Sequence, residues 1–104
     1  NFDWDNLNSL ADCKVAEIQT NDAGGCQIDT VTDTISLYSS SGYLTKDANN
    51  FYVYNGTTPT KFRRQIQIKL NPIENELNEA LVDVKVNWGS DGDSVEVKTL
   101  IYNY

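Results

Sequence analysis

The two cysteines are the residues best suited to covalent chemistry in this chain of 104 residues. Cys13 and Cys26 lie on either side of a glycine-containing loop, NDAGG, and three kinds of chemistry compete for them. A disulfide would stabilise the fold by roughly 3 kcal/mol in the chain-entropy model. A metal centre needs about four nitrogen or sulfur ligands, and the chain has no histidine to complete one. A reactive thiol needs a base and an electropositive setting, and neither is visible. The sequence therefore favours a Cys13–Cys26 disulfide, and with it an oxidising compartment such as the periplasm or the cell surface.

Acid–base and nucleophilic catalysis find little support in the remaining residues. Without histidine there is no imidazole base and no Ser-His triad, and the chain has no Walker or GxGxxG phosphate loop. Paired carboxylates do occur, at Asp91 with Asp93 and at Glu74 with Glu76. A glycosidase needs two carboxyls that converge in a cleft, and 15 acidic residues produce neighbouring pairs by chance. We therefore expect no enzymatic activity, no metal site and no cofactor.

Three short patterns are typical of binding or modification. Ser90–Ser94 reads SDGDS, but it lacks the spacing and the terminal bidentate Glu of an EF-hand, which favours a hairpin turn with solvated carboxylates. Asn55-Gly56-Thr57 fits the N-glycosylation pattern, although a turn explains Asn-Gly without a sugar. Aromatic side chains could line a sugar- or partner-binding face, although in strands they usually serve packing first. The aromatic residues considered are Tyr38, Tyr43, Tyr52, Tyr54, Tyr102, Tyr104, Trp4 and Trp88.

The charge of the chain excludes one class of partner. A formal charge of −7 and a pI near 4.3 argue against nucleic acid, whose phosphates bind clustered Lys and Arg. The one small basic cluster, Lys61, Arg63 and Arg64, is interpreted as a solvated strand end. The chain has no apolar run near the roughly 20 residues of a membrane span, and its start lacks the pattern of a signal peptide. It contains no Met, so we expect a processed or trimmed piece of a longer protein.

The stretch from Leu81 to Tyr104 is expected to form the β-hairpin around which the chain is organised. Apolar and polar residues alternate on both sides of a Gly- and Asp-rich break, as in strands with one buried face. A two-residue turn at Asp91-Gly92 sets a register in which apolar residues meet at each rung. The pairs are Trp88 with Val95, Val86 with Val97, Val84 with Thr99 and Val82 with Ile101. The opposite face is mixed in charge and is interpreted as solvent surface: Asp83, Lys85, Asn87, Glu96 and Lys98.

Helical spacing occurs only near the start of the chain. Within Asn1–Ala16, Asp3 is a candidate cap and four apolar residues recur on one helical face. These are Trp4, Leu7, Leu10 and Ala11. The density of Asn and Asp lowers helix propensity, so we expect one or two turns and then a loop.

The remaining segments predict strands and loops. Strands are expected from Gln27 through VTDTISLY, at Phe51–Tyr54 before an Asn55-Gly56 turn, and at Lys61–Leu70, where Arg64 is a misfit placed at the sheet margin. Tyr43–Asn50 is expected as a loop, Thr57–Thr60 as a segment that does not easily continue a ladder, and Asn71–Ala80 as an acidic loop or helical turn. The predicted fold is α+β: a short N-terminal helical segment packed on a four- to five-stranded antiparallel sheet. It forms a single domain, 1–104, with the β-rich head at 27–104.

The C-terminal pattern resembles that of type IV pilin-like proteins. Val82-x-Val84-x-Val86-x-Trp88, a Gly/Asp turn and Val95-x-Val97-x-Thr99-x-Ile101 resemble the end of minor pilins and of type II secretion pseudopilins. Lys61–Leu70 resembles their preceding strand. Phe2–Leu7 resembles the segment where the long pilin helix gives way to the αβ-loop. The resemblance covers roughly the last 44 residues and the first ten. The position of Cys13 and Cys26 near the start departs from major pilins, whose disulfide closes a C-terminal loop, and fits a minor subunit better.

The resemblance implies a function carried by surfaces rather than by a reaction. It implies the soluble head of a minor pilin or pseudopilin, a structural assembly subunit whose partners are other pilin or pseudopilin subunits. It also implies a full-length protein anchored in the inner membrane by an N-terminal helix missing here, a cell-surface or periplasmic location, and a monomeric fragment. The alternative is an extracellular β-rich binding module, an adhesin or carbohydrate-binding domain that uses the aromatic residues.

Overall fold

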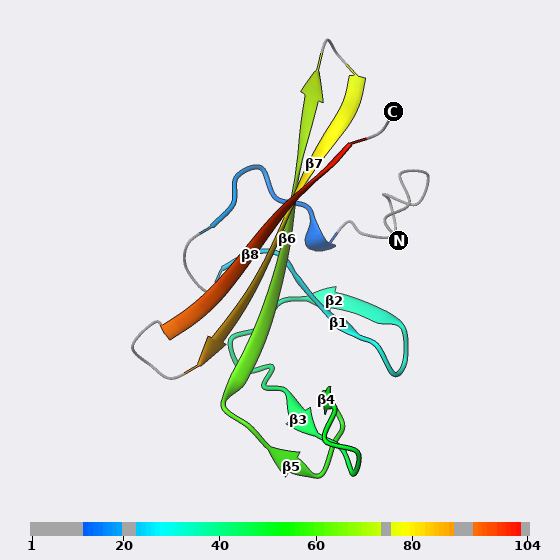
Figure 1. Cartoon of the computed structure of the whole chain (residues 1–104), viewed down its shortest axis with the longest axis vertical. Helices are drawn as coiled ribbons and strands as arrows, with labels where there is room; N and C mark the ends of the chain where they lie inside the picture. Colours follow the sequence, from blue (N-terminus) through cyan, green and yellow to red (C-terminus); the bar gives the residue numbers. More distant parts are fainter. Residues whose placement is uncertain (1–11, 20–22, 74–75, 89–92, 103–104) are drawn as a thin grey trace.

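The computed structural model describes residues 12–19, 23–73, 76–88 and 93–102, and these residues form an almost entirely β structure (Figure 1). Eight strands in this part of the chain make two antiparallel sheets. The larger sheet has the order β2-β1-β6-β7-β8 and the smaller one the order β4-β3-β5. The strands are β1 Cys26–Asp29, β2 Thr34–Leu37, β3 Thr45–Lys46, β4 Tyr52–Val53, β5 Thr58–Pro59, β6 Phe62–Ile73, β7 Glu76–Trp88 and β8 Asp93–Tyr102.

The α+β prediction is wrong, because the described residues contain no α-helix. Residues 1–11 of the expected helical stretch lie outside the described residues. Its remainder follows β6 instead: Lys14 forms a parallel bridge with Ile68, and the N–H of Val15 donates to the Ile68 carbonyl at 2.9 Å. These backbone groups are paired with a strand, so they are not available to a helical turn. The described residues also hold no helix long and apolar enough to cross a membrane.

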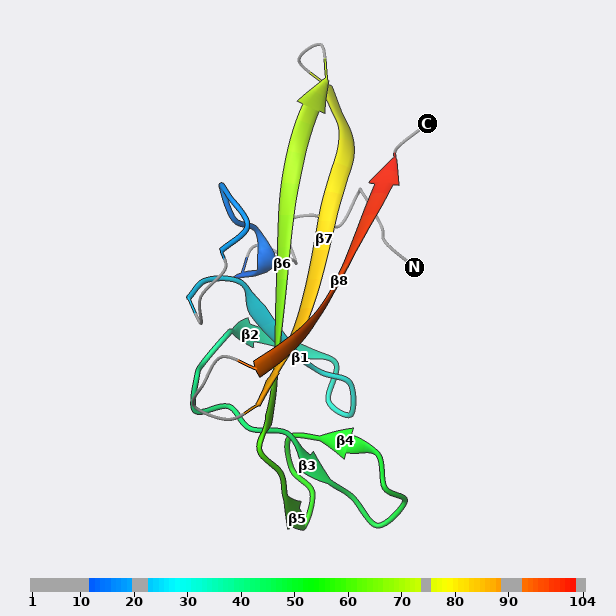
Figure 2. The ribbon, with the colours of Figure 1, turned by 60° about the vertical axis from the view of Figure 1, so that its left-hand side comes forward.

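The prediction of an acidic loop or helical turn at Asn71–Ala80 is also wrong. β6 and β7 contain 12 and 13 residues and remain paired up to the Ile73–Glu76 rung, so most of Asn71–Ala80 is strand. The β6–β7 register shifts between Asn71 and Pro72, which marks a β-bulge. A bulge of this kind accepts a residue that has no N–H to give to the ladder. In both ribbon views the long strands β6 and β7 run side by side along most of the molecule, and the small sheet of β3, β4 and β5 lies beyond their lower end (Figures 1 and 2).

The C-terminal hairpin is confirmed, but its register differs from the predicted one by two residues. Trp88 pairs with Asp93 rather than with Val95. The predicted register would place Lys85 opposite Lys98, whereas the observed one places Lys85 opposite Glu96 and Asp83 opposite Lys98. Opposite charges across a strand pair stabilise it and like charges destabilise it, which favours the observed register. A shift by two preserves the faces, so the predicted alternation is retained.

The shorter strands correct three further expectations. The run expected as one strand from Gln27 is a hairpin of β1 and β2, with Asp33 at a φ of 54° in its turn. Thr45–Lys46, expected within a loop, is the central strand β3, which pairs with both β4 and β5. Thr58–Pro59 therefore does join a ladder, and Asn55-Gly56 does not form a two-strand hairpin turn, because β4 and β5 lie on opposite sides of β3.

The two faces of the sheet formed by β6, β7 and β8 are not buried as expected, because the polar face is largely buried on β7 and the apolar face is partly exposed. Asp83, Lys85 and Asn87, interpreted from the sequence as solvent surface, are all buried. On the face that carries the alternating valines, Val95 is 56% exposed and Val97 is 60% exposed. Apolar packing is concentrated nearer β1 and β6. Its buried members are Cys13, Cys26, Ile68 and Ala80, with Ile28, Ile35, Ile66, Leu70 and Val82 packed against them.

Candidate functional sites

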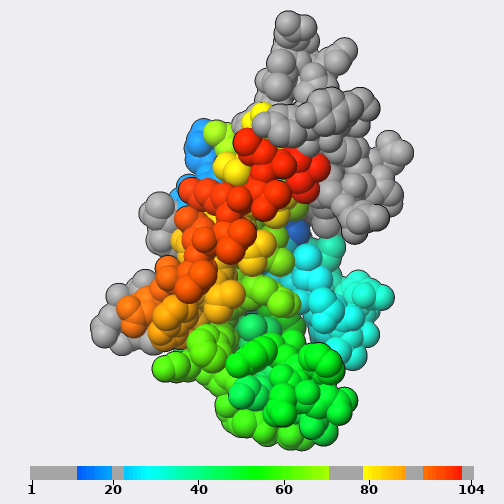
Figure 3. Space-filling view, viewed as in Figure 1, coloured from blue at the N-terminus to red at the C-terminus, as the bar shows by residue number. Residues whose placement is uncertain are grey.

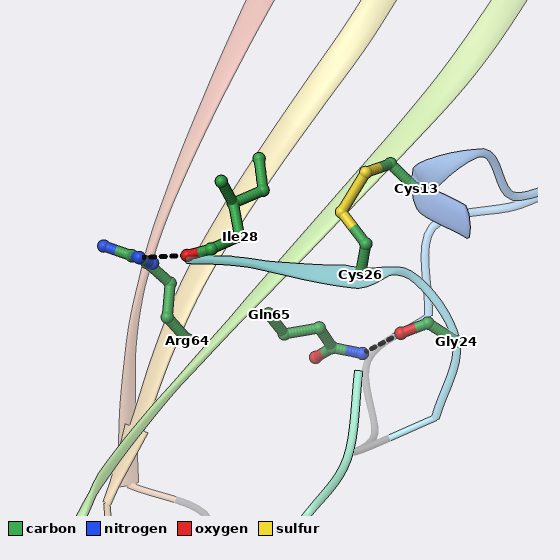
Figure 4. Close-up of a disulfide and its surroundings, with 6 residues drawn as sticks. All are labelled: Cys13, Gly24, Cys26, Ile28, Arg64 and Gln65. Carbon is green, nitrogen blue, oxygen red and sulfur yellow. Dashed lines mark hydrogen bonds between the residues drawn. A yellow bond between two sulfur atoms is a disulfide. The ribbon is translucent and has the colours of Figure 1, made fainter. Parts of the chain in front are cut away.

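The disulfide joins two segments that both lie against β6 (Figure 4). Cys13 and Cys26 are fully buried, with 4.5 Å between their Cα atoms. Cys26 pairs with Ile66 of β6, while the residue after Cys13 bridges Ile68. The bond therefore fixes both ends of the intervening chain along one edge of the same strand.

The chain between the cysteines crosses the polar face of the sheet; we name residues 15–19 and 23–25 the covering segment. The Gln67 side chain makes both backbone hydrogen bonds that a neighbouring strand would make to Gln19. Its Oε1 accepts from the Gln19 N–H at 2.8 Å, and its Nε2 donates to the Gln19 carbonyl at 3.0 Å. Gln65 donates through Nε2 to the carbonyls of Ala23 and Gly24 at 2.9 and 2.8 Å. Both glutamines are fully buried. Buried amides require such partners, so these side chains hold the covering segment on the sheet.

Beside the glutamines lies a cluster of four charged groups on β7 and β8. Asp83 is fully buried, and Glu96, its diagonal neighbour, lies 4.0 Å from Lys85 and 3.6 Å from Lys98. Burial, followed by the neighbouring Glu96, raises the pKa of Asp83 to about 6. Neither carboxylate oxygen of Asp83 has a hydrogen-bond partner among the described residues. The interaction with Asp83, together with both lysines, lowers the pKa of Glu96 despite some desolvation. With Asp83 inaccessible, no substrate reaches that carboxyl in this conformation.

One free edge of the large sheet is formed by β8, a long strand that is mostly exposed. β8 contains 10 residues and is last in the strand order, and no described strand pairs with its outer side. Residues 93–100 are all exposed. In the space-filling view β8 runs across the visible face, in orange to red, over β7 and β6 (Figure 3). An edge strand of this length presents unpaired backbone N–H and C=O groups to any strand that can approach it.

A second candidate site is an apolar pocket of about 310 Å³ between the two sheets. It is lined by Leu44, Tyr52, Phe62, Arg64 and Val86. Arg64 lies in the central strand β6, not at a sheet margin as predicted, and donates to the Ile28 carbonyl at 3.0 Å (Figure 4). Its Nε has no hydrogen-bond partner. Burial raises the pKa of the nearby Tyr54 hydroxyl, and the charge of Arg64 opposes that shift.

The other residues considered from the sequence are not brought into one site. Asp91 and Glu74 lie outside the described residues, as do Ser90 and Gly92 of the calcium-like segment, while Asp93 is exposed at the start of β8. The described residues contain no group of three or more Cys, Asp or Glu side chains that could hold a metal ion. Asn55 and Thr57 are exposed.

The basic cluster is divided between the two faces of β6. Arg63 donates to the Ser40 carbonyl at 3.1 Å and stacks over Tyr43, whereas Arg64 enters the pocket and Lys61 is exposed. The aromatic residues are similarly divided, because Phe62 packs between Tyr52 and Trp88, away from Tyr43. Trp4 and Tyr104 lie outside the described residues.

Sequence reasoning missed the buried polar face. Gln65 and Gln67 alternate with apolar residues as a solvated strand face does, and β6 is central in the sheet. In the fold these glutamines instead bond the backbone of the loop that the disulfide closes. No family model, curated protein or solved structure matches this chain.

Proposed function

We propose that this chain is a disulfide-bonded structural assembly subunit that acts through protein–protein contacts, with the free edge of β8 as its contact surface. The observation that carries the proposal is the length of that edge strand and the exposure of its residues 93–100. Natural proteins usually protect such edges with prolines, bulges, short strands or several lysines. β8 has no proline and one lysine, Lys98. Strand addition, in which a partner strand pairs with the free edge, fits these features.

The chemistry of β8 supports a protein partner. One face presents Val95 and Val97, and the other presents Glu96 and Lys98. A partner strand would gain backbone hydrogen bonds along the edge, while alternate side chains provide apolar contact on one face and charge pairing on the other. Nucleic acid is a poor fit, because the chain carries a formal charge of −7.

The proposed cellular setting is a surface or periplasmic filament of the type IV pilus or type II secretion kind. It rests on the resemblance of the C-terminal hairpin and on the disulfide, which belongs in an oxidising compartment. Determining the coding sequence upstream of Asn1 tests this setting. A short basic leader, a processing site and roughly 20 apolar residues would support it, and a conventional cleaved signal peptide or another globular domain would contradict it.

Site-specific photo-crosslinking in the source cells tests the contact surface. A photoreactive amino acid at Val97 of β8 is compared with one at Leu37 of β2, the edge strand on the other side of the sheet. Leu37 is 67% exposed, so the two positions are similarly accessible. We expect defined protein adducts from position 97 and few from position 37. Equal labelling from both positions, or none from position 97, would contradict the proposal.

A carbohydrate-binding function is the second candidate, and the exposure of two aromatic residues favours it. Phe51 is 66% exposed and Tyr52 is 44% exposed, and Tyr52 also lines the apolar pocket. Aromatic faces beside a pocket can stack on sugar rings or on apolar ligands. Titration with a panel of glycans, monitored by NMR shifts of residues 51–62, tests it. Shifts that disappear in Tyr52→Ala but persist in Tyr43→Ala would support this alternative.

A further inference from the structure

We infer that the partner strand of β8 is β8 of a second copy of this chain, paired antiparallel about a two-fold axis at Val97. The inference rests on the proposed function and names its partner. It revises the expectation from sequence that this chain is monomeric. Two observations carry it: the free edge, and the charge order along the rungs that β6, β7 and β8 already form.

The charges of the existing ladder continue across such an interface with alternating sign. Within one copy, Asp83 is opposite Lys98 and Lys85 is opposite Glu96. With the axis at Val97, Lys98 of one copy faces Glu96 of the second copy. A row of charged residues then crosses the interface. It begins with Asp83 and Lys98 of one copy and continues with Glu96 and Lys85 of the second copy. Opposite charges meet at every step of this row, which is the favourable arrangement for directly opposed residues.

The apolar face becomes continuous in the same register. Val97 meets Val97 of the second copy, and Val95 meets Thr99 of the second copy. Since Ile66 is already paired with Val84 and Val84 with Val97, a single row of six aliphatic side chains crosses the interface. This places Val95 and Val97, at 56% and 60% exposure in one copy, inside a larger apolar surface.

Neighbouring registers and the parallel arrangement are less favourable. An axis at Glu96 sets Glu96 against itself, and an axis at Lys98 sets Lys98 against itself, which places like charges in contact. A register shifted by a single residue opposes Glu96 and Val97, and so joins the polar face of one copy to the apolar face of the other. A parallel two-fold pairing inverts the second sheet and has the same defect. The axis at Val97 satisfies both faces, and a two-fold interface is self-complementary in this way.

Disulfide trapping tests the register with a matched pair of variants. In Val97→Cys the two new thiols lie directly opposite each other, within the Cα separation that a disulfide accepts. Val95 lies on the same face and is about equally exposed. In Val95→Cys the two new thiols are four residues apart along the strands, a Cα separation of roughly 13 Å, and a disulfide accepts only roughly 7 Å. The native cysteines are bonded and buried, so they do not compete.

We expect Val97→Cys to form a covalent dimer in a glutathione redox buffer at least about tenfold faster than Val95→Cys. A mixture of Val95→Cys and Thr99→Cys should form the mixed dimer, whereas Val95→Cys alone should not. Sedimentation equilibrium of the unmodified chain should show a concentration-dependent dimer, and Val97→Lys should remain monomeric.

Crosslinking of Val95→Cys as fast as that of Val97→Cys would overturn the register. A chain that stays monomeric at every concentration, with equal slow crosslinking of both variants, would overturn the self-pairing. That last result would leave the proposed function standing if photo-crosslinking at position 97 still captured a different protein. If position 97 captured nothing in cells either, both would fail.

Discussion

Asp83 on β7 and Glu96 on β8 are diagonal neighbours on the polar face, and Asp83 is fully buried with no hydrogen-bond partner for either carboxylate oxygen among the described residues. Burial and the neighbouring carboxylate both disfavour the charged form of Asp83, which raises its pKa from 3.8 to about 6. Lys85 and Lys98 oppose this shift without cancelling it. The sheet therefore contains a carboxyl group that takes up a proton at a higher pH in the folded chain than in the unfolded one.

The first prediction concerns the pH dependence of stability. Because the folded pKa of Asp83 lies above its unfolded value, the folded chain binds this proton more tightly, and the stability it contributes is complete below the unfolded pKa. That contribution is lost as pH rises from 3.8 to about 6. Asp83→Asn removes the charge, so the variant should be more stable than the natural chain at neutral pH by about 1–2 kcal/mol. Urea unfolding across this pH range measures the difference.

Glu96 acts in the opposite direction, because its lowered folded pKa contributes stability that is lost as pH falls. Its partial exposure keeps that contribution small. Asp93→Asn, which removes an exposed carboxylate at the start of β8, is the control. Parallel pH profiles for Asp83→Asn and the natural chain would show that Asp83 has no raised pKa.

The second prediction compares two adjacent glycines that enter β1. Gly24 and Gly25 have φ values of 79° and 81°, so alanine is strained at both positions. At Gly25 an added Cβ would also collide with the backbone carbonyl of Ile66 and would lie 2.8 Å from Cγ of Gln67, whereas at Gly24 the nearest side chains are at 3.7 Å. We expect Gly24→Ala to cost about 1 kcal/mol and Gly25→Ala about 3 kcal/mol or more. Equal losses in denaturant unfolding would mean that the close approach of Gly25 to β6 is not rigid.

The alternation of β7 and β8 could be predicted from sequence because strand periodicity is local. The pattern predicts their hairpin and which residues share a face, although the register differs by two residues and the burial of the two faces is partly reversed. The observed register pairs Asp83 with Lys98 and Lys85 with Glu96, whereas the predicted register maximises apolar matching alone. Charge pairing on one face decided between two registers that apolar alternation treats as equivalent.

The burial of the polar face could not be predicted, because it depends on contacts distant in sequence. Gln67 is buried by Gln19, 48 positions earlier, and Gln65 by Gly24, 41 positions earlier. Neither glutamine differs locally from a solvated strand residue. The error over Asn71–Ala80 has a similar origin, because pairing of β6 with β7 overrides the tendency of Pro72 to end a strand.

The third prediction tests the role of Gln67 in holding the covering segment. Gln67→Leu preserves much of the side-chain volume but leaves the Gln19 N–H without its partner and leaves the Gln19 carbonyl with only the long 3.4 Å bond from Lys85 Nζ. One unsatisfied N–H and one weakened carbonyl bond should cost about 1–3 kcal/mol if the groups stay buried, or less if the segment moves into water. Gln27→Leu is the control, since the Gln27 Oε1 accepts a long bond of 3.4 Å from an exposed N–H. We expect faster hydrogen exchange at Gln19 in Gln67→Leu alone, and unchanged exchange there would contradict this role.

The fourth prediction concerns the disulfide. Replacing both Cys13 and Cys26 with alanine releases one end of the covering segment from β6 and increases the conformational freedom of the unfolded chain. The expected loss is about 3 kcal/mol from chain entropy, with a further loss from the missing sulfur atoms in the buried cluster. The β7–β8 pairing involves neither cysteine. Hydrogen exchange should therefore rise first at residues 15–19 and 23–25 and only later in β7. If β7 and the covering segment exchanged at the same increased rate, the disulfide would instead support the whole sheet, and self-pairing through β8 would then require an oxidised chain.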